Sequence, residues 1–179
     1  LPDATYKEID STAGHDAFLI EFKQMEAFIK PFLEGKDLRK WHKESRDLYL
    51  IFSRRGIDID NYPIIKEHLS KYRDRWEPKP KNWPSNQRWY GRKPGPYKWY
   101  EIQDTIAYYE EFEKTKIVYP DISQRAKFSF DMKGSYFGNT VYFLSTDDYF
   151  LLGLLNSHLI WFYWCGISNA IRGGFFRMF

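Results

Sequence analysis

The chain has 179 residues, a length that fits one domain and excludes a multidomain catalytic machine. Hydrophobic residues make up 43% of it and charged residues 28%, so the chain can bury a core and is neither disordered nor collagen-like. The single cysteine, Cys165, excludes an internal disulfide and a four-cysteine zinc site, which favours a reducing, cytoplasmic location. Because the sequence begins at Leu1 without a methionine and ends in apolar residues, we expect residues 1–179 to be one domain of a longer protein.

Short strands and helices are predicted to alternate through the first half of the chain. Apolar and aromatic runs predict strands over residues 15–22 and 48–52, and a short helical piece is expected over residues 24–29, ending at Pro31. The clearest helix pattern starts near Pro63, which suits a first helical turn, with Asp60 or Asn61 as its cap. Its apolar face consists of Ile65, His68, Leu69, Tyr72 and Trp76.

The second half continues with a possible helix over residues 105–114 and three short strands over 116–119, 128–130 and 140–144. A hydrophobic helix is predicted over residues 147–166, with Asp147 and Asp148 at its positive N-terminal end. Polar residues in its middle, including Asn156 and Ser157, argue against a membrane span, so we expect a buried core helix in which these two side chains are satisfied by a helix contact. The irregular order predicts an α+β fold, a compact mixed domain with mostly antiparallel strands.

A basic and aromatic loop interrupts this pattern between about residues 77 and 98. The window from Lys71 to Lys98 carries a charge of +7, so the rest of the chain carries −4. Five prolines break the window, and tryptophan and tyrosine residues alternate with its cations. Positive charge interleaved with aromatic rings outside regular structure is typical of a surface that contacts phosphates and packs on bases or sugars.

Motifs for catalysis are sparse. The chain has no glycine-rich phosphate loop, and its four histidines show no metal-ligand spacing. Asp121, Asp131 and Lys133 follow the Pro-Asp, (Asp/Glu)-x-Lys spacing of magnesium-dependent nucleases, in which two carboxylates hold the metal and a lysine stabilises charge. The same three residues also suit ordinary turns at strand ends, and we favour that interpretation.

Six segments together resemble one known family, the TaqI-like C-terminal specificity domain. They occur in the order of that family, from about residue 11 onward: AFLI at 17–20, KPFLEGKDL at 30–38, YLIF at 49–52, YPIIKEHL at 62–69, KIVYPDIS at 116–123 and LLNS at 154–157. The resemblance implies the target-recognition part of type II restriction-modification enzymes and adenine-specific DNA methyltransferases.

Such a domain reads a short duplex sequence and presents it to a methyltransferase domain, usually on its N-terminal side. The Asn-Pro-Pro-Tyr type motif of adenine methyltransferases is absent from the chain. We therefore expect no catalytic residue, no resident metal and no cofactor here, with S-adenosylmethionine and possibly Mg²⁺ bound elsewhere in the parent protein.

Sequence-specific binding needs cations on phosphates and planar donors or acceptors on base edges. The candidate phosphate contacts, chosen for their place in turns and loops, are Lys36, Arg39, Lys40, Arg54, Arg55, Lys93 and Lys98. The candidates for reading bases are Arg88, Arg92, Gln124 and Arg125, because Arg pairs with guanine and Gln with adenine. Trp89 and Tyr90 have two alternatives that the sequence leaves open: one of these rings packs on sugars or at a base step, or they pack in the core of the protein.

Two other classes of function remain open at this point. The first is the nuclease with Asp121, Asp131 and Lys133, and the second is a carbohydrate-binding module that stacks exposed tryptophans on sugar rings. Neutral glycans give no reason for the strongly positive loop, which favours DNA over sugar.

Overall fold

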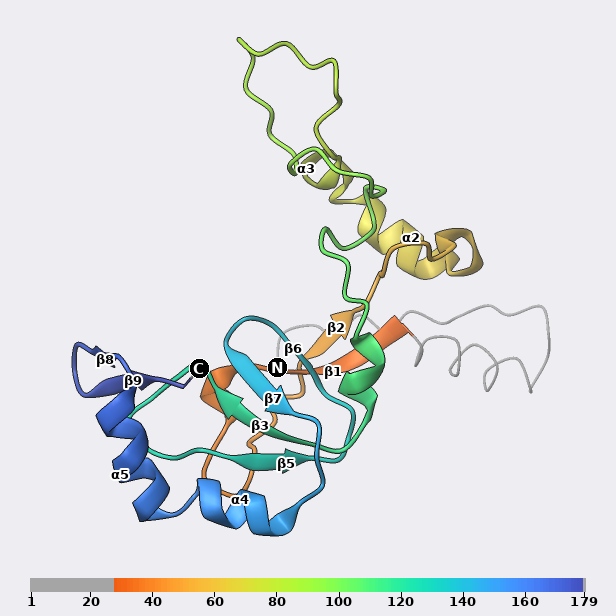
Figure 1. The fold of residues 1–179 in the computed structure, drawn as a ribbon. Helices are drawn as coiled ribbons and strands as arrows, with labels where there is room; N and C mark the ends of the chain where they lie inside the picture. The colour runs from red at the N-terminus through yellow and green to blue at the C-terminus, as the bar shows by residue number, and fades with distance from the viewer. Residues whose placement is uncertain (1–27, 179) are drawn as a thin grey trace, which may run out of the picture.

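The computed structural model describes residues 28–178 (Figure 1). The strand expected over residues 15–22 and most of the helix expected over 24–29 lie outside this range. Phe28 is helical and Ile29 already belongs to strand β1 (Ile29–Leu33), so the predicted helical piece ends at Phe28, one residue before its expected end. Pro31 fits in β1 because strand β6 (Tyr136–Phe137) pairs only with Phe32 and Leu33, and the missing N–H of Pro31 therefore interrupts no bond on that side.

Two three-stranded sheets form the centre of the body of the molecule. In one, β1 lies between the antiparallel β2 (Tyr49–Ile51) and the parallel β6. In the other, β3 (Lys116–Pro120) lies between β5 (Ser129–Asp131) and β7 (Val141–Leu144), both antiparallel to it. All three strands predicted for this region are confirmed. The mixture of short strands and helices confirms the α+β class.

The third sheet is made by the end of the chain. β4 (Ile122–Ser123) directly follows β3 and pairs with β9 (Phe175–Arg177), which forms a hairpin with β8 (Ala170–Ile171). The hairpin turn contains Gly173 and Gly174 at φ of +80° and +74°, a backbone conformation that side chains other than glycine disfavour. The C-terminal hairpin is thereby attached to the end of the central strand β3.

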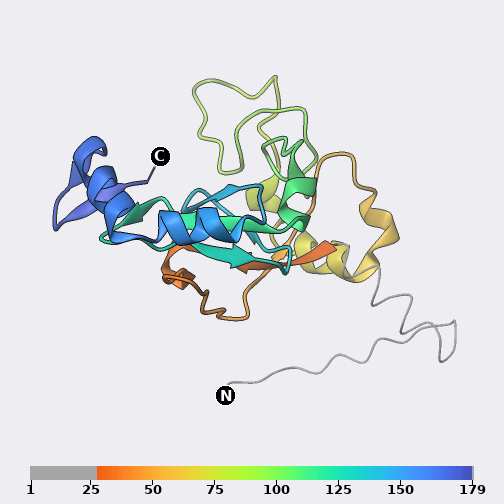
Figure 2. The ribbon, with the colours of Figure 1, turned by 60° about the horizontal axis from the view of Figure 1, so that its bottom comes forward.

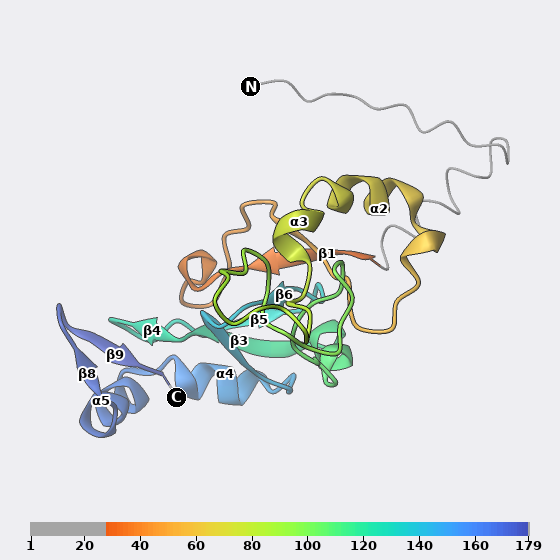
Figure 3. The same cartoon turned by 90° about the horizontal axis from the view of Figure 1, so that it is seen from above.

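Residues 53–107 form a projecting lobe that extends away from the sheets (Figure 1). Seen from above, part of this lobe overlies the sheets (Figure 3). Its helices are the 3-10 turn η2 (Ile59–Asn61), α2 (Pro63–Ser70) and α3 (Arg73–Trp76). The predicted helix over residues 63–76 is thus two helices, and Tyr62 rather than Asp60 or Asn61 occupies the N-cap position of α2. Ile65 and Leu69 are buried as the periodicity predicted, in a small core with Ile59, Tyr100 and Phe28.

Two further 3-10 turns complete the chain, η1 (Gly35–Asp37) and η3 (Tyr109–Glu113). The helix expected over residues 105–114 is therefore only the short turn η3.

The predicted C-terminal helix is also two helices, α4 (Tyr149–Leu155) and α5 (His158–Ile167), bent by 60° at Asn156 and Ser157. Asn156 is buried, and its side-chain amide both donates to and accepts from the backbone of Phe128, at 2.8 and 3.2 Å. Ser157 caps α5 by accepting from the Ile160 N–H. These two polar residues are satisfied within the fold, as expected, but they also end α4.

The prediction that this helix is buried is wrong for α5. α4 runs along the central sheet (Figure 2), and Leu152 packs with Ile117 and Phe128. α5 buries no residue completely, and Phe162 is 79% exposed. Within the described residues, neither helix alone has the length and hydropathy to cross a bilayer; only the bent pair taken together reaches them.

Candidate nucleic-acid interface

The positive loop of the projecting lobe keeps three of its predicted contact cations at the surface. Arg88, Lys93 and Lys98 are exposed, and none of them forms a salt bridge with the part of the protein that is described. The Arg88 guanidinium lies 5.5 Å from the ring centroid of Tyr90, which is itself 80% exposed. A cation and a ring are thus presented together to solvent, an arrangement suited to a phosphate and its sugar.

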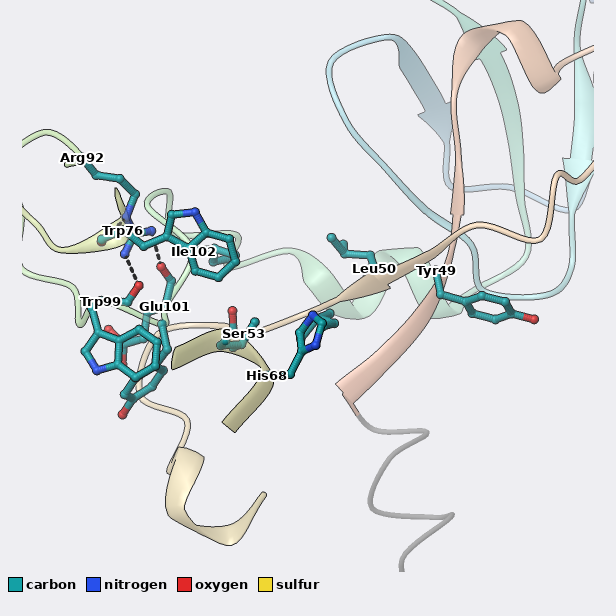
Figure 4. Close-up of a pocket in the computed structure, with 12 residues that line it drawn as sticks. Tyr49, Leu50, Ser53, His68, Trp76, Arg92, Trp99, Glu101 and Ile102 are labelled. Carbon is teal, nitrogen blue, oxygen red and sulfur yellow. Dashed lines mark hydrogen bonds between the residues drawn. The ribbon is translucent and has the colours of Figure 1, made fainter. Parts of the chain in front are cut away.

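Arg92 has a different role from the predicted base reading. Its guanidinium donates to the backbone carbonyls of Trp76, Glu101, Lys98 and Trp99 at 2.6 to 3.0 Å. Figure 4 shows Arg92 beside Trp76, Trp99 and Glu101. Burial lowers the pKa of Arg92. Because its donors are occupied by the protein, Arg92 fastens the loop to α3 and to the turn at residues 98–101. The predicted contact of Arg92 with a base is therefore corrected.

Trp89 also packs within the loop. Its ring lies 4.8 Å from that of Trp83 in an edge-on contact, and its indole N–H donates to the Arg92 carbonyl at 3.0 Å. A Cβ at Gly91 would lie 2.3 Å from the Glu77 carbonyl oxygen, so only glycine allows this close approach. Tyr90, rather than Trp89, is therefore the ring of this pair that is free to contact a ligand.

A recess of about 410 Å³ separates the loop from β2 and α2, with Trp76, Trp99 and His68 among its walls (Figure 4). The buried carboxylate of Glu101 lines it, but this group already accepts the Gly56 and Lys98 N–H groups at 2.9 and 2.8 Å. The charged groups of this recess, Glu101 and Arg92, thus serve the internal structure of the lobe.

Arg54 and Arg55 lie where the lobe joins the body. Arg54 is exposed above the ring of Tyr109, 5.2 Å from its centroid. Arg55 lies over the ring of Tyr97 and donates to the Gln103 carbonyl, so it links the two segments that lead into and out of the lobe. Of these two predicted phosphate contacts, Arg54 is therefore the more accessible to a ligand.

The fold brings the other predicted contacts together in a second basic region, the body patch, on the body of the molecule. A β-bridge between Leu38 and Lys43 closes a turn over residues 39–42, and the Trp41 N–H donates to the Phe128 carbonyl at 3.0 Å. The segment with Lys36, Arg39 and Lys40 therefore lies beside the one with Gln124 and Arg125, although more than eighty residues separate them. The body patch comprises Lys36, Arg39, Lys40, Gln124, Arg125 and Lys127.

Part of this charge is neutralised and part is not. Lys36 pairs with Glu34 at 3.0 Å and Arg39 with Glu44 at 2.6 Å. Lys40, Arg125 and Lys127 have no acidic partner among residues 28–178. Burial lowers the pKa of Lys127, and the positive charges of Arg39 and Arg125 lower it further. Crowded cations of this kind are stabilised by an external anion such as a phosphate.

The sequence predictions missed Lys127, a member of the body patch, and Trp41, which lies in the turn beside Lys40. Lys127 follows Arg125 by two residues in the same connection, a local signal that could have identified it. Trp41 is 52% exposed and has φ of +76°, a strained conformation for a bulky residue. Lys40 lies 5.4 Å from its ring centroid, so the turn presents a cation and an indole side by side.

Gln124 retains part of its predicted capacity for base reading. Its side-chain N–H donates to the Gly173 carbonyl at 2.8 Å, which leaves its exposed amide oxygen as an acceptor. The hydrogen bond holds Gln124 against the C-terminal hairpin.

The proposed nuclease residues are not brought together. Asp131 is paired in register with Lys116 at the start of β3, whereas Asp121 follows the other end of that strand. Five strand residues separate the two ends, so the carboxylates lie on the order of 16 Å apart, too far to share one metal ion. Residues 28–178 contain no cluster of three or more His, Cys, Asp or Glu side chains placed to bind a metal.

Asp131 is instead a buried structural carboxylate. It forms ion pairs with Lys43 and, at 2.7 Å, with Lys116, and it accepts the Ser135 N–H and hydroxyl at 2.7 and 3.0 Å. Burial alone would raise the pKa of Asp131, but the hydrogen bonds from Lys116 and Lys43 outweigh it and bring the pKa from 3.8 to about 2. Its charge is therefore retained down to strongly acidic pH.

This pKa predicts how stability depends on acidity. A lowered carboxyl pKa stabilises the fold above the unfolded-state value near 3.8, and the contribution is lost as pH falls through about 2. We expect about 2 kcal/mol of unfolding free energy from this group to disappear between pH 4 and pH 2. Urea unfolding curves recorded at half-unit pH steps measure this loss, and Asp131→Asn, in which the group cannot titrate, should show a flatter profile.

Comparison with known proteins gives one match along most of the chain and two short ones. The sequence profile of the TaqI-like C-terminal specificity domain matches residues 30–179. A homoserine O-acetyltransferase of Moorella thermoacetica is 67% identical over 36 residues, and one of Cyclobacterium marinum is 53% identical over 32 residues. The chain spans 9% of the length of each of these two enzymes, and the matches cover 20% and 18% of the chain.

Matches of 36 and 32 residues do not show that the chain has the activity of these two enzymes. The profile, in contrast, runs from β1 through the projecting lobe and all three sheets to the C-terminal hairpin, and so includes both basic regions. The chain belongs to the TaqI-like C-terminal specificity domain family and is a DNA-recognition module of restriction-modification enzymes.

Proposed function

We propose that the chain reads a short sequence in double-stranded DNA and positions that target for a methyltransferase domain of the same protein. The parent is an adenine-specific DNA methyltransferase of a type II restriction-modification system, with or without endonuclease activity, in the cytoplasm. Residues 1–179 serve as its recognition domain and perform no chemistry themselves. The methyltransferase part of the parent binds S-adenosylmethionine, and any Mg²⁺ belongs to a nuclease part.

The body patch is the observation that carries this proposal. Lys40, Arg125 and Lys127 form no salt bridge within the described protein, and burial together with the neighbouring charges of Arg39 and Arg125 lowers the pKa of Lys127. Arrays of uncompensated cations release counterions when they bind phosphates, and this release supplies much of the affinity of proteins for DNA. Lys40 and Lys127 are assigned to phosphates, and Arg125 and the free oxygen of Gln124 to base edges.

The loop of the projecting lobe extends the contact surface. Arg88, Lys93 and Lys98 are assigned to phosphates, and the exposed ring of Tyr90 to a sugar or base step. Carbohydrate binding is less well supported, because Trp41 is the one tryptophan in residues 28–178 whose ring is largely exposed. A sugar platform usually needs flat rings open to solvent, and here the loop tryptophans pack on one another.

Salt dependence tests the assignment of the body patch. We expect the double variant Lys40→Ala, Lys127→Ala to bind duplex DNA more weakly and to reduce the slope of log K against log salt by about 0.9 for each lost contact. The measurement is fluorescence anisotropy of a labelled duplex at several salt concentrations. The matched control is Lys66→Ala, Lys114→Ala, which removes two surface lysines already paired with Asp60 and Glu111.

An unchanged slope in the double variant, with the control also unchanged, would exclude the body patch as a phosphate-binding surface. Equal binding of duplex DNA and neutral oligosaccharides would refute sequence recognition. In the parent protein, the double variant should lower the methylation rate without weakening binding of S-adenosylmethionine, since the latter does not involve these residues.

A further inference from the structure

Trp41 lies at the edge of the body patch and exposes its ring to solvent. It is 52% exposed, and its indole N–H has no acceptor among residues 28–178. Its ring also contacts no other aromatic ring in this range. By comparison, the indole N–H groups of Trp83 and Trp164 donate to backbone carbonyls at 3.1 and 3.2 Å. The indole of Trp41 thus keeps an unused donor and an open apolar surface.

The turn that carries Trp41 holds it in a strained backbone conformation. The φ of Trp41 is +76°, in the left-handed region that bulky side chains disfavour. The Trp41 N–H donates to the Phe128 carbonyl at 3.0 Å, and the Arg39 N–H donates to the His42 carbonyl at 2.9 Å across the turn. Strain of this kind persists only where surrounding contacts fix the backbone, and it is concentrated at ligand-binding sites. The backbone thus fixes the direction in which the indole leaves the turn.

Cations without acidic partners lie beside this ring. The Lys40 ammonium is 5.4 Å from the ring centroid of Trp41. Lys127 directly precedes Phe128, whose carbonyl accepts the Trp41 N–H. Neither lysine forms a salt bridge within residues 28–178. An aromatic ring among such cations matches a polyanion that also offers flat bases, whereas an apolar protein surface would leave the cations without counter-ions.

We propose that Trp41 is a DNA-contact residue whose indole inserts at a base step of the duplex and partly unstacks it. This inference rests on the proposed function, because it assumes that the body patch binds duplex DNA. Lys40 contacts the phosphate beside that step. Every base has a face on which a ring can stack, but pyrimidine–purine steps unstack most easily. Trp41 therefore favours a TA or CA/TG step without reading base edges.

The indole suits insertion because it is flat, apolar and carried by a turn whose backbone is fixed. Apolar side chains that enter base steps act as wedges, and the cost of unstacking is offset by the further contacts that a bent duplex makes. The strained φ of Trp41 is a cost in the free protein, and burial of the exposed ring between bases offsets it in the complex. A ring that lay on a sugar would leave the step stacked, so the fluorescence of the bases distinguishes the two contacts.

Binding by substituted proteins gives the first test. Trp41→Gly removes the ring without straining the turn, because glycine adopts a positive φ freely. We expect it to bind duplex DNA about tenfold more weakly at every salt concentration, with an unchanged slope of log K against log salt, since an indole neutralises no phosphate. Trp41→Phe should recover part of this affinity. The control is Phe162→Ala, which removes an exposed ring from α5 and should bind as wild type does.

Stability separates a contact with DNA from a role in the fold. The urea midpoint of Trp41→Gly should equal or exceed that of the wild-type protein, because the strain at φ of +76° is relieved. A lower midpoint together with weaker binding would assign Trp41 to the fold and overturn the proposal. Equal affinity of Trp41→Gly and wild type for duplex DNA would also overturn it, and would leave DNA recognition intact.

Fluorescence of the DNA gives the second test. The fluorescent base 2-aminopurine, which is quenched while it is stacked, replaces the adenines of a duplex selected from a randomised pool, one at a time. The wild-type protein should raise the fluorescence at one TA or CA/TG step, and Trp41→Gly should not. No rise at any step, or a rise that Trp41→Gly retains, would refute the insertion. Absence of salt-dependent binding to any duplex would refute the proposed function along with it.

Discussion

Replacement of Asp131 by Asn is expected to lower the free energy of unfolding by about 3–5 kcal/mol, far more than a substitution at the protein surface. Asp131 and Lys116 are both completely buried, and their charged groups are 2.7 Å apart. An amide at position 131 leaves the Lys116 ammonium in the interior without a counter-ion. Removing one partner of a buried pair costs much more than the net contribution of the pair, because the remaining charge stays desolvated.

The position of this pair in the fold adds to the effect. Lys116 begins β3, Asp131 ends β5, and Lys43 reaches the same carboxylate from the segment that carries the turn of the body patch. Asp131 also accepts the N–H groups of Lys133 and Ser135, so it organises the turn that leads to β6. Loss of the carboxylate therefore loosens two sheets and the body patch together.

Urea unfolding followed by circular dichroism measures this effect at neutral pH. Lys133→Ala is the matched control, since Lys133 is exposed, lies two residues away and should change stability by less than about 0.5 kcal/mol. A loss below about 1 kcal/mol in Asp131→Asn would contradict the structural role. Activity measurements are not needed, and the result is independent of whether the chain binds DNA.

Replacement of Arg92 by Ala is expected to open the loop of the projecting lobe at a cost of about 3 kcal/mol in local stability. The substitution removes donors to four backbone carbonyls, and buried acceptors left without a partner cost about 1–3 kcal/mol each, less where water reaches them. Arg92→Lys should recover little of this, because one ammonium group cannot reproduce the planar fork of a guanidinium.

Hydrogen exchange of the native protein distinguishes local opening from global unfolding. Protection should fall for the Glu101 N–H, which donates to the Lys98 carbonyl, and for the Arg92 N–H, which donates to the Glu77 carbonyl. Protection in β3 should be unchanged. Arg88→Ala is the control, as its side chain is exposed and its guanidinium lies over the ring of Tyr90. Equal protection in wild type and Arg92→Ala would show that Arg92 does not hold the loop.

Local sequence patterns were sufficient for the elements whose signals are short-range. β3, β5 and β7 were predicted because each is a run of β-branched or aromatic residues between turn residues, and such a run favours a strand wherever it later pairs. The start of α2 at Pro63 and the irregular course of the proline-rich loop follow from backbone restrictions that act within a few residues. The resemblance to the specificity-domain family was likewise recognised from six short sequence segments.

Contacts between residues far apart in the sequence determined the features that the sequence did not predict. The helix predicted over 147–166 bends at Asn156 because its amide pairs with Phe128, 28 residues earlier. Arg92 was assigned to a base on its charge, but its acceptors are carbonyls up to 16 residues away that only the folded lobe brings within reach. Arg39 and Arg125 were predicted separately, and the pairing of residues 38–43 and 128 makes them neighbours. Charge and residue type can be read from the sequence, whereas which charges stay free depends on partners supplied by tertiary packing, since hydrogen bonds and ion pairs act over only a few ångströms.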